Sequence, residues 1–216
     1  MVQEKGSQGA FDLPRLLTGR GLGQSRVRLA PAEAAYLQDD PADAMFYIEN
    51  GWVKITIVIA SGKEALVAIR GDGELFGMRC LVGRPRTGAA VALTACSLVR
   101  VASSTVIRLL REEPDFAVTF ACRLAERSIR DQQNLVDRLT NSAEKRLAHA
   151  LLRLSDRGSR PITKLVDQAV LASIVGTTRP RISFFLNRFR RQGLIEYSRV
   201  GLLQVREAAL ADFLKT

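Results

Sequence analysis

Basic and polar residues recur at helical spacing between positions 179 and 190, and their chemistry suits nucleic acid. Arg179, Ser183, Asn187 and Arg190 share, together with Pro180, the side of a predicted helix that is opposite to an apolar stripe. The apolar stripe consists of Ile182, Phe185, Leu186 and Phe189. A guanidinium can fork onto a phosphate or a base edge, and a hydroxyl can donate to either. The stretch therefore predicts a helix with one buried face and one face that meets a partner.

Two short helices and a tight turn are needed to position that outer face. The first helix is expected over residues 168–175 and ends at Gly176, because glycine readily takes the left-handed conformation of a sharp turn. Thr178 is expected to cap the second helix, which carries Pro180 in its first turn and runs to about Gln192. Two helices around a glycine-containing turn, the second with a basic face, are typical of the DNA-binding helix-turn-helix.

The net charge of +10 lies mostly in the half of the chain that holds this motif. Residues 1–112 carry 14 Lys and Arg against 11 Asp and Glu, whereas residues 113–216 carry 18 against 11. A basic domain favours phosphate backbones because binding releases condensed counterions. We therefore expect double-stranded DNA as a partner.

Composition and motifs argue against several other classes of protein. No apolar run approaches the roughly 18 residues of a membrane span, and the N-terminus lacks the apolar region of a secretory signal, so no membrane partner is expected. The 3 cysteines, Cys80, Cys96 and Cys122, are widely spaced and indicate a reducing cytoplasm rather than a disulfide framework. We find no nucleophile–base pair, metal-ligand spacing or P-loop, so no enzyme, metal site or resident cofactor is predicted.

Residues 25–105 are expected to form β structure, because short runs rich in Val, Ile and Leu are punctuated by turn residues. Met45–Glu49 ends at Asn50-Gly51, a strong hairpin signal, and Trp52–Ala60 follows as the next strand. Many short strands at this spacing favour a small antiparallel barrel or sandwich.

A long helix is expected from Asp115 to about Leu139, where no Gly or Pro interrupts the chain. Residues at a spacing of three to four form a narrow seam with charged neighbours, which is typical of a coiled-coil partner. The alternative is a helix that packs against its own β domain. The predicted dimer interface comprises Phe120, Leu124, Ser128, Leu135 and Leu139.

The expected fold class is α+β in three parts. An N-terminal antiparallel β-roll occupies residues 1–112, and a dimerisation helix with its hinge occupies residues 113–141. A winged helix-turn-helix occupies residues 142–216, where Ser142 caps the first helix. Its wing is a predicted hairpin formed by Leu194–Tyr197 and Leu202–Val205.

This order of parts resembles the Crp/Fnr family of bacterial transcription regulators. The segments that carry the resemblance are Phe46-Tyr47-Ile48 with Gly51, Gly71-Asp72-Gly73 leading to Leu75-Phe76-Gly77, Glu144-Lys145-Arg146-Leu147-Ala148, and Ile174-Val175-Gly176-Thr177-Thr178-Arg179. The resemblance implies that the β-roll is of jelly-roll type, similar to a cyclic-nucleotide-binding domain. It also implies a homodimer whose β-rolls sense a signal and whose second motif helices enter adjacent major grooves. It also implies RNA polymerase as a partner, as in many members of the family.

The same resemblance defines a candidate effector region. Family members that bind cyclic nucleotides follow Phe-Gly with Glu, and they use a later Arg–Ser or Arg–Thr pair for the cyclic phosphate. Here Met78 replaces the acidic acceptor, whereas Arg86-Thr87 resembles the phosphate pair. A degenerate pocket is therefore preferred over cyclic nucleotide binding. Buried, inert thiols at Cys80 and Cys96 are preferred over a thiol switch, which is the alternative. The predicted region is Phe76, Gly77, Met78, Arg86, Thr87, Asp131 and Gln132.

For DNA readout, the resemblance assigns a guanine contact to Arg179. Pro180 cannot make the cytosine contact of the Glu found in many members, and Phe184 replaces a base-reading Arg. Five arginines are interpreted as phosphate contacts: Arg181, Arg188, Arg190, Arg191 and Arg199. The predicted DNA-binding residues are Thr177, Thr178, Arg179, Arg181, Ser183, Asn187, Arg188 and Arg199.

The sequence thus predicts a homodimeric, sequence-specific DNA-binding transcription regulator in the cytoplasm. The alternative function is a cyclic-nucleotide sensor that acts through protein contacts. Tight binding of a cyclic nucleotide without DNA affinity would favour that alternative.

Overall fold

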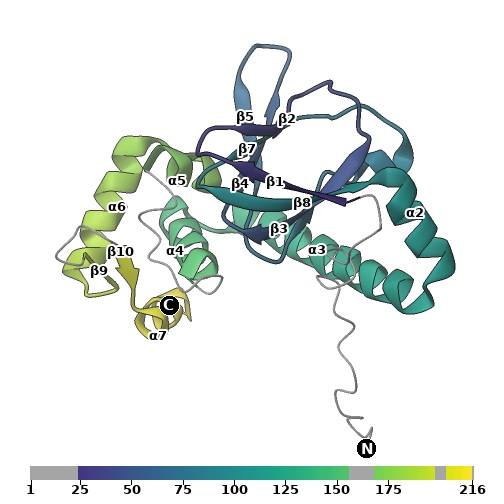
Figure 1. Ribbon diagram of the computed structural model, residues 1–216. Coiled ribbons are helices and arrows are strands. Elements are labelled where there is room, and N and C mark those ends of the chain that lie inside the picture. The colour runs from purple at the N-terminus through teal and green to yellow at the C-terminus, as the bar shows by residue number, and fades with distance from the viewer. Residues whose placement is uncertain (1–23, 156–167, 198–202, 216) are drawn as a thin grey trace, which may run out of the picture.

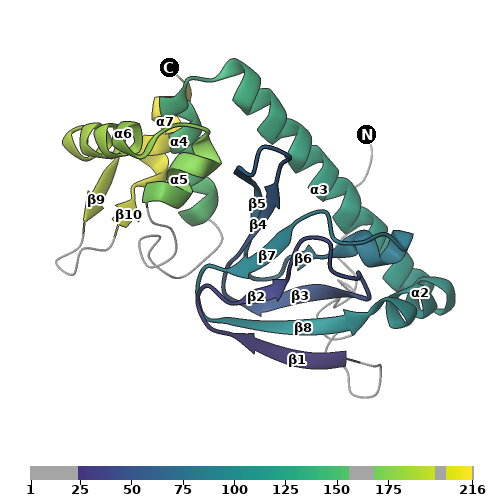
Figure 2. The same ribbon diagram turned by 90° about the horizontal axis from the view of Figure 1, so that it is seen from above.

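The computed structural model describes residues 24–155, 168–197 and 203–215. A β-roll packs along the long helix α3 (Pro114–Thr140), and a smaller helical unit with a two-stranded sheet follows the end of that helix (Figures 1 and 2). No described helix is both long enough and apolar enough to span a membrane. This arrangement confirms the expected α+β fold class.

Two four-stranded antiparallel sheets form the β-roll, with the orders β1-β8-β3-β6 and β2-β7-β4-β5. The strands are β1 (Gln24–Leu29), β2 (Ala34–Tyr36), β3 (Ala44–Asn50), β4 (Val53–Val58), β5 (Glu64–Arg70), β6 (Leu75–Phe76), β7 (Ala89–Ala92) and β8 (Cys96–Ala102). A short 3-10 helix, η1 (Met78–Val82), and helix α2 (Ser103–Glu112) complete the domain.

Strand β3 is buried on both faces, and this explains its unbroken apolar run. Phe46 and Ile48 pack with residues of both sheets in the inner layer. Met45 and Tyr47 pack on the other side with residues of α2 and with Phe116 at the start of α3. Successive side chains of a strand point to opposite faces, so β3 contributes to two cores at once.

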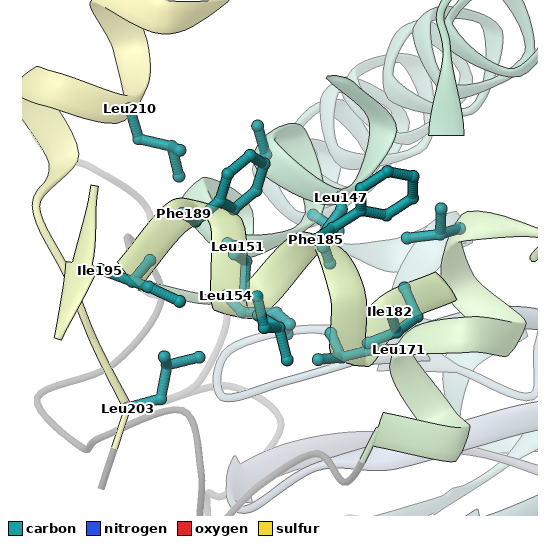
Figure 3. Packing of buried hydrophobic residues seen from close by; sticks show 14 of the residues in the cluster. Leu147, Leu151, Leu154, Leu171, Ile182, Phe185, Phe189, Ile195, Leu203 and Leu210 are labelled. Atoms are coloured by element: carbon teal, nitrogen blue, oxygen red, sulfur yellow. The ribbon is translucent and has the colours of Figure 1, made fainter. Parts of the chain in front are cut away.

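The C-terminal unit surrounds a third core that all its elements share (Figure 3). Its elements are α4 (Ala143–Ser155), α5 (Gln168–Val175), α6 (Arg179–Arg191), β9 (Ile195–Tyr197), β10 (Leu203–Val205) and α7 (Glu207–Lys215). Strands β9 and β10 pair antiparallel, which confirms the two strands of the predicted wing. The turn between them lies outside the described residues.

Of two local predictions, the helix cap at Ser142 is confirmed and the hairpin at Asn50-Gly51 is wrong. Ser142 does cap α4, since the amide of Lys145 donates to its Oγ at 3.3 Å. The hairpin at Asn50-Gly51 is wrong, because β3 and β4 lie in different sheets. Gly51, at φ 107°, instead serves a close approach: an added Cβ would lie 2.6 Å from the Sγ of Cys96. The chain crosses between the sheets at this point.

Candidate nucleic-acid interface

Helix α6 carries the predicted site and is fixed by its apolar face. Ile182, Phe185 and Phe189 are buried in the C-terminal core, as Figure 3 shows. The left-handed Gly176, at φ 69°, makes the turn before the helix, where the amide of Thr177 donates to the carbonyl of Ala172 at 2.9 Å. Thr178 occupies the N-cap position as predicted, but its side chain makes no capping hydrogen bond.

The opposite face of α6 is open to solvent and basic. Five of the predicted DNA-binding residues are exposed, one before the helix and four on it: Thr178, Arg179, Arg181, Asn187 and Arg188. Thr177 and Ser183 are half-buried beside them. Arg199, which is predicted to contact phosphate, lies outside the described residues. The structure therefore gathers seven of the eight predicted residues around one exposed helix face.

Two of the arginines are held by neighbouring side chains. Arg188 donates from Nη1 to the Oε2 of Glu144 at 3.1 Å, which ties α6 to α4. The other carboxylate oxygen, Oε1, is buried without a partner among the described residues. The guanidinium of Arg181 lies 5.8 Å from the centre of the Phe185 ring. Glu144 is not predicted as a functional residue from the sequence, because an acidic residue on another helix gives no local signal of this pairing.

Arg146 connects this unit to the end of the long helix. Its Nε donates to the carbonyl of Val175 at the end of α5 at 2.8 Å, and its Nη1 donates to the carbonyl of Asn141 at 2.7 Å. Both acceptors are main-chain carbonyls at helix ends, which have no partner within their helices. Arg146 therefore helps to hold the helix-turn-helix in its position relative to α3.

The predicted effector region is only partly assembled. Phe76 is buried and stacks on Phe46, with ring centres 5.0 Å apart, so it belongs to the core. Arg86 is also buried, and it donates to the carbonyls of Gly77 at 2.6 Å and Ala44 at 2.5 Å. Its guanidinium lies 4.1 Å from the centre of the Tyr36 ring.

The remaining members of this region lie around Arg127 or are exposed. Arg127 donates to the sulfur of Met78 at 3.7 Å and pairs with Asp131 at 3.6 Å. Asp131 also pairs with Arg70 of β5 at 3.8 Å. Thr87 and Gln132 are exposed. Arg70, Arg127 and Tyr36 therefore join this region although none of them was predicted from the sequence.

These residues fit a cyclic nucleotide poorly. The two terminal nitrogens of Arg86 already donate to main-chain carbonyls, and Met78 offers no acceptor for a ribose hydroxyl. Gly77, at φ 80°, is part of the same arrangement, since an added Cβ would lie 2.9 Å from the Nη1 of Arg86. The contacts of this region hold the guanidinium of Arg86 in place and do not leave it free to bind a phosphate.

The exposed surface of α3 includes four of the five predicted seam residues and three apolar residues that were not predicted. Phe120 is buried in the core of its own β-roll and stacks on Phe116, with ring centres 5.7 Å apart, so it is not part of an exposed seam. The other four predicted residues, Leu124, Ser128, Leu135 and Leu139, are exposed. Exposed apolar side chains of α3 that the prediction did not include are Val118, Ile129 and Val136.

The cysteines and acidic residues supply no reactive or metal-binding cluster in the described part of the chain. Cys80 and Cys96 are buried, and burial raises the pKa of both thiols, which disfavours the reactive thiolate. Cys122 is exposed on α3. No group of three or more His, Cys, Asp or Glu side chains among the described residues is placed to hold a metal ion.

A β-roll that is joined through a long helix to a winged helix-turn-helix defines the class of two-domain transcription regulators. The sequence profile of the cyclic nucleotide-binding domain matches residues 26–113, and that of the Crp-like helix-turn-helix domain matches residues 145–213. The chain is 31% identical to the Cyclic AMP receptor protein of Thermus thermophilus over 188 residues, which cover 86% of each protein.

A second relative and a solved structure agree with this similarity. The chain is 27% identical over 167 residues to a CRP-like cAMP-activated global transcriptional regulator of Mycobacterium tuberculosis, covering 74% of this chain and 75% of that one. The fold matches that of FixK2 from Bradyrhizobium japonicum with a TM-score of 0.78 at 19% identity, covering 88% of this chain and 96% of that one. The chain belongs to the Crp/Fnr family of transcription regulators.

Proposed function

We propose that the protein binds DNA as a homodimer and places one α6 helix in each of two adjacent major grooves. The observation that carries this proposal is the outer face of α6, where Arg179, Arg181 and Asn187 are exposed on a helix whose other face is fully packed. A helix of this kind fits the major groove, and its arginines match phosphates and guanine edges.

The exposed apolar residues of α3 support the homodimer. Ile129, Leu135 and Val136 are 54%, 58% and 57% exposed, which is unusual for large apolar side chains on one helix. A second copy of the same helix would cover them in a parallel pair. On the strength of the family resemblance, the same proposal places the protein in the cytoplasm and makes RNA polymerase a further partner.

DNA binding is tested by fluorescence anisotropy on sites selected from a random duplex library at moderate salt. Arg179→Ala is expected to lower affinity roughly 5- to 100-fold per half-site, because one bidentate base contact is lost. Arg28→Ala is the matched control, since it removes the same charge from an exposed position on β1 and should leave affinity nearly unchanged. If the wild-type protein selects no DNA from the library, the proposal is wrong.

We further infer that the β-roll does not read a cyclic phosphate through Arg86. One relative is named a cyclic AMP receptor protein and another a cAMP-activated regulator. In this chain the two terminal nitrogens of Arg86 are occupied by the carbonyls of Gly77 and Ala44. Calorimetry with cAMP and cGMP is expected to give no saturable heat. Tight binding would overturn this inference, and tight binding without DNA affinity would favour a sensor that acts through protein contacts.

A further inference from the structure

An aromatic ring stands at the centre of the outer face of α6. Phe184 is 58% exposed, whereas Phe185 and Phe189 of the same helix are buried. With 3.6 residues per turn, Phe184 lies on one line with Pro180 and Asn187, opposite the packed face. An isolated exposed apolar residue is ordinary on a protein surface, so its exposure alone carries no meaning. Its position is informative, because Phe184 lies on the helix face that the proposed function places in the major groove.

The ring is also held in position. Phe184 packs edge-on against Phe185, with ring centres 5.7 Å apart and planes inclined at 67°. Phe185 is buried and lies next to the guanidinium of Arg181. Contact with a fixed ring limits the orientations of Phe184, so less conformational freedom is lost when it meets a partner.

The chemistry of a phenyl ring restricts what it can read in the groove. It has no hydrogen-bond donor or acceptor, so it cannot satisfy a phosphate or the polar edges of guanine, cytosine and adenine. The one apolar group exposed in the major groove is the C5-methyl of thymine. We propose that Phe184 is a base-reading residue that selects thymine at one position of each half-site. This inference rests on the proposed DNA binding by α6.

The experiment removes the methyl group from the DNA and the ring from the protein in turn. Sites selected by the wild-type protein are resynthesised with uracil in place of thymine at each position, and affinity is measured by anisotropy at fixed salt. At one symmetric position, uracil is expected to weaken wild-type binding roughly fourfold per half-site, the effect of one buried methyl. Phe184→Ala should bind the thymine and uracil sites equally.

Two further measurements sharpen the test. Restoring the methyl with a 5-methylcytosine·guanine pair at that position should be preferred over plain cytosine by the wild-type protein and not by Phe184→Ala. Val82→Ala is the control, because it truncates another exposed apolar residue, on η1, and should keep the full sensitivity to uracil. Since Phe184 is exposed, its removal should not change the melting temperature.

The outcomes separate this inference from the function on which it rests. If wild type binds selected DNA but uracil has the same effect on wild type and Phe184→Ala at every position, the inference is wrong and DNA binding stands. The inference is also wrong, and DNA binding again stands, if Phe184→Ala loses contact with a protein partner while its DNA preferences are unchanged. If no DNA is selected, both proposals fall together.

Discussion

Arg86 shows why a motif at the residue scale does not by itself define a ligand site. Its spacing after Phe76-Gly77 resembles a phosphate-binding pair, yet its donors serve the carbonyls of Gly77 and Ala44. Tyr36 covers the guanidinium from strand β2, which belongs to a different sheet from the strand β3 that carries Ala44. Burial raises the pKa of Tyr36 in spite of the opposing effect of Arg86. The sequence predicted Phe76, Gly77 and Arg86 for this region but not Tyr36, because only the packing of the two sheets brings it near.

Arg86→Leu is expected to destabilise the protein. It would leave the two carbonyls without their donors inside the β-roll, and each unsatisfied buried acceptor costs roughly 1–3 kcal/mol. Thermal denaturation should show a melting temperature lowered by several degrees. Arg84→Leu is the matched control, because Arg84 is exposed two residues earlier and its loss should be nearly neutral. Equal melting of the two variants would show that the hydrogen bonds of Arg86 are not needed for the fold.

The helices and strands were easier to predict than the partners that cover them. The uninterrupted stretch after Pro114 predicted α3 closely, yet periodicity cannot tell whether an apolar residue meets its own domain or a second copy. Phe120 has the spacing of the seam and packs inward, whereas Ile129 and Val136 face outward. Likewise, Asn50-Gly51 has the composition of a hairpin, and only the assembled sheets show that the chain crosses between them there.

Pairing of α3 with a second copy predicts that Leu135→Glu dissociates the dimer. A carboxylate at this position would face its own copy or be buried without a partner, and both are unfavourable. Sedimentation velocity should show a shift from dimer to monomer, with the helical content retained because Leu135 is exposed within one chain. Val82→Glu, at an exposed site on η1, should remain dimeric. A Leu135→Glu variant that sediments like wild type would rule out this face of α3 as the interface.

At the scale of the whole molecule, the two domains share apolar contacts. Trp52, Ile69 and Leu93 of the β-roll join the same core cluster as the helices of the C-terminal unit, and α5 lies beside β5. Together with the contact of Arg146 to Val175, these residues fix the orientation of α6 relative to α3. The junction therefore couples the position of the C-terminal unit to that of the β-roll.

Ile69→Asp is expected to separate the two domains. An unpaired carboxylate in an apolar cluster is strongly unfavourable, so the docked arrangement should lose population. Small-angle X-ray scattering should give a larger radius of gyration, and calorimetry should resolve two unfolding transitions. Val67→Asp places the same charge at an exposed position of β5 and should leave both measurements unchanged. Unaltered scattering for Ile69→Asp would show that the junction does not hold the domains together.

The junction also gives the molecule an intrinsic optical probe. Trp52 is the only tryptophan of the chain, and it is 5% exposed within the cluster that joins the domains. Its amide and carbonyl are fixed by Thr94 and Leu93. The emission of this indole therefore reports the contact between the two domains directly. A red shift on adding a metabolite or a DNA duplex would record domain movement in the unlabelled, full-length protein.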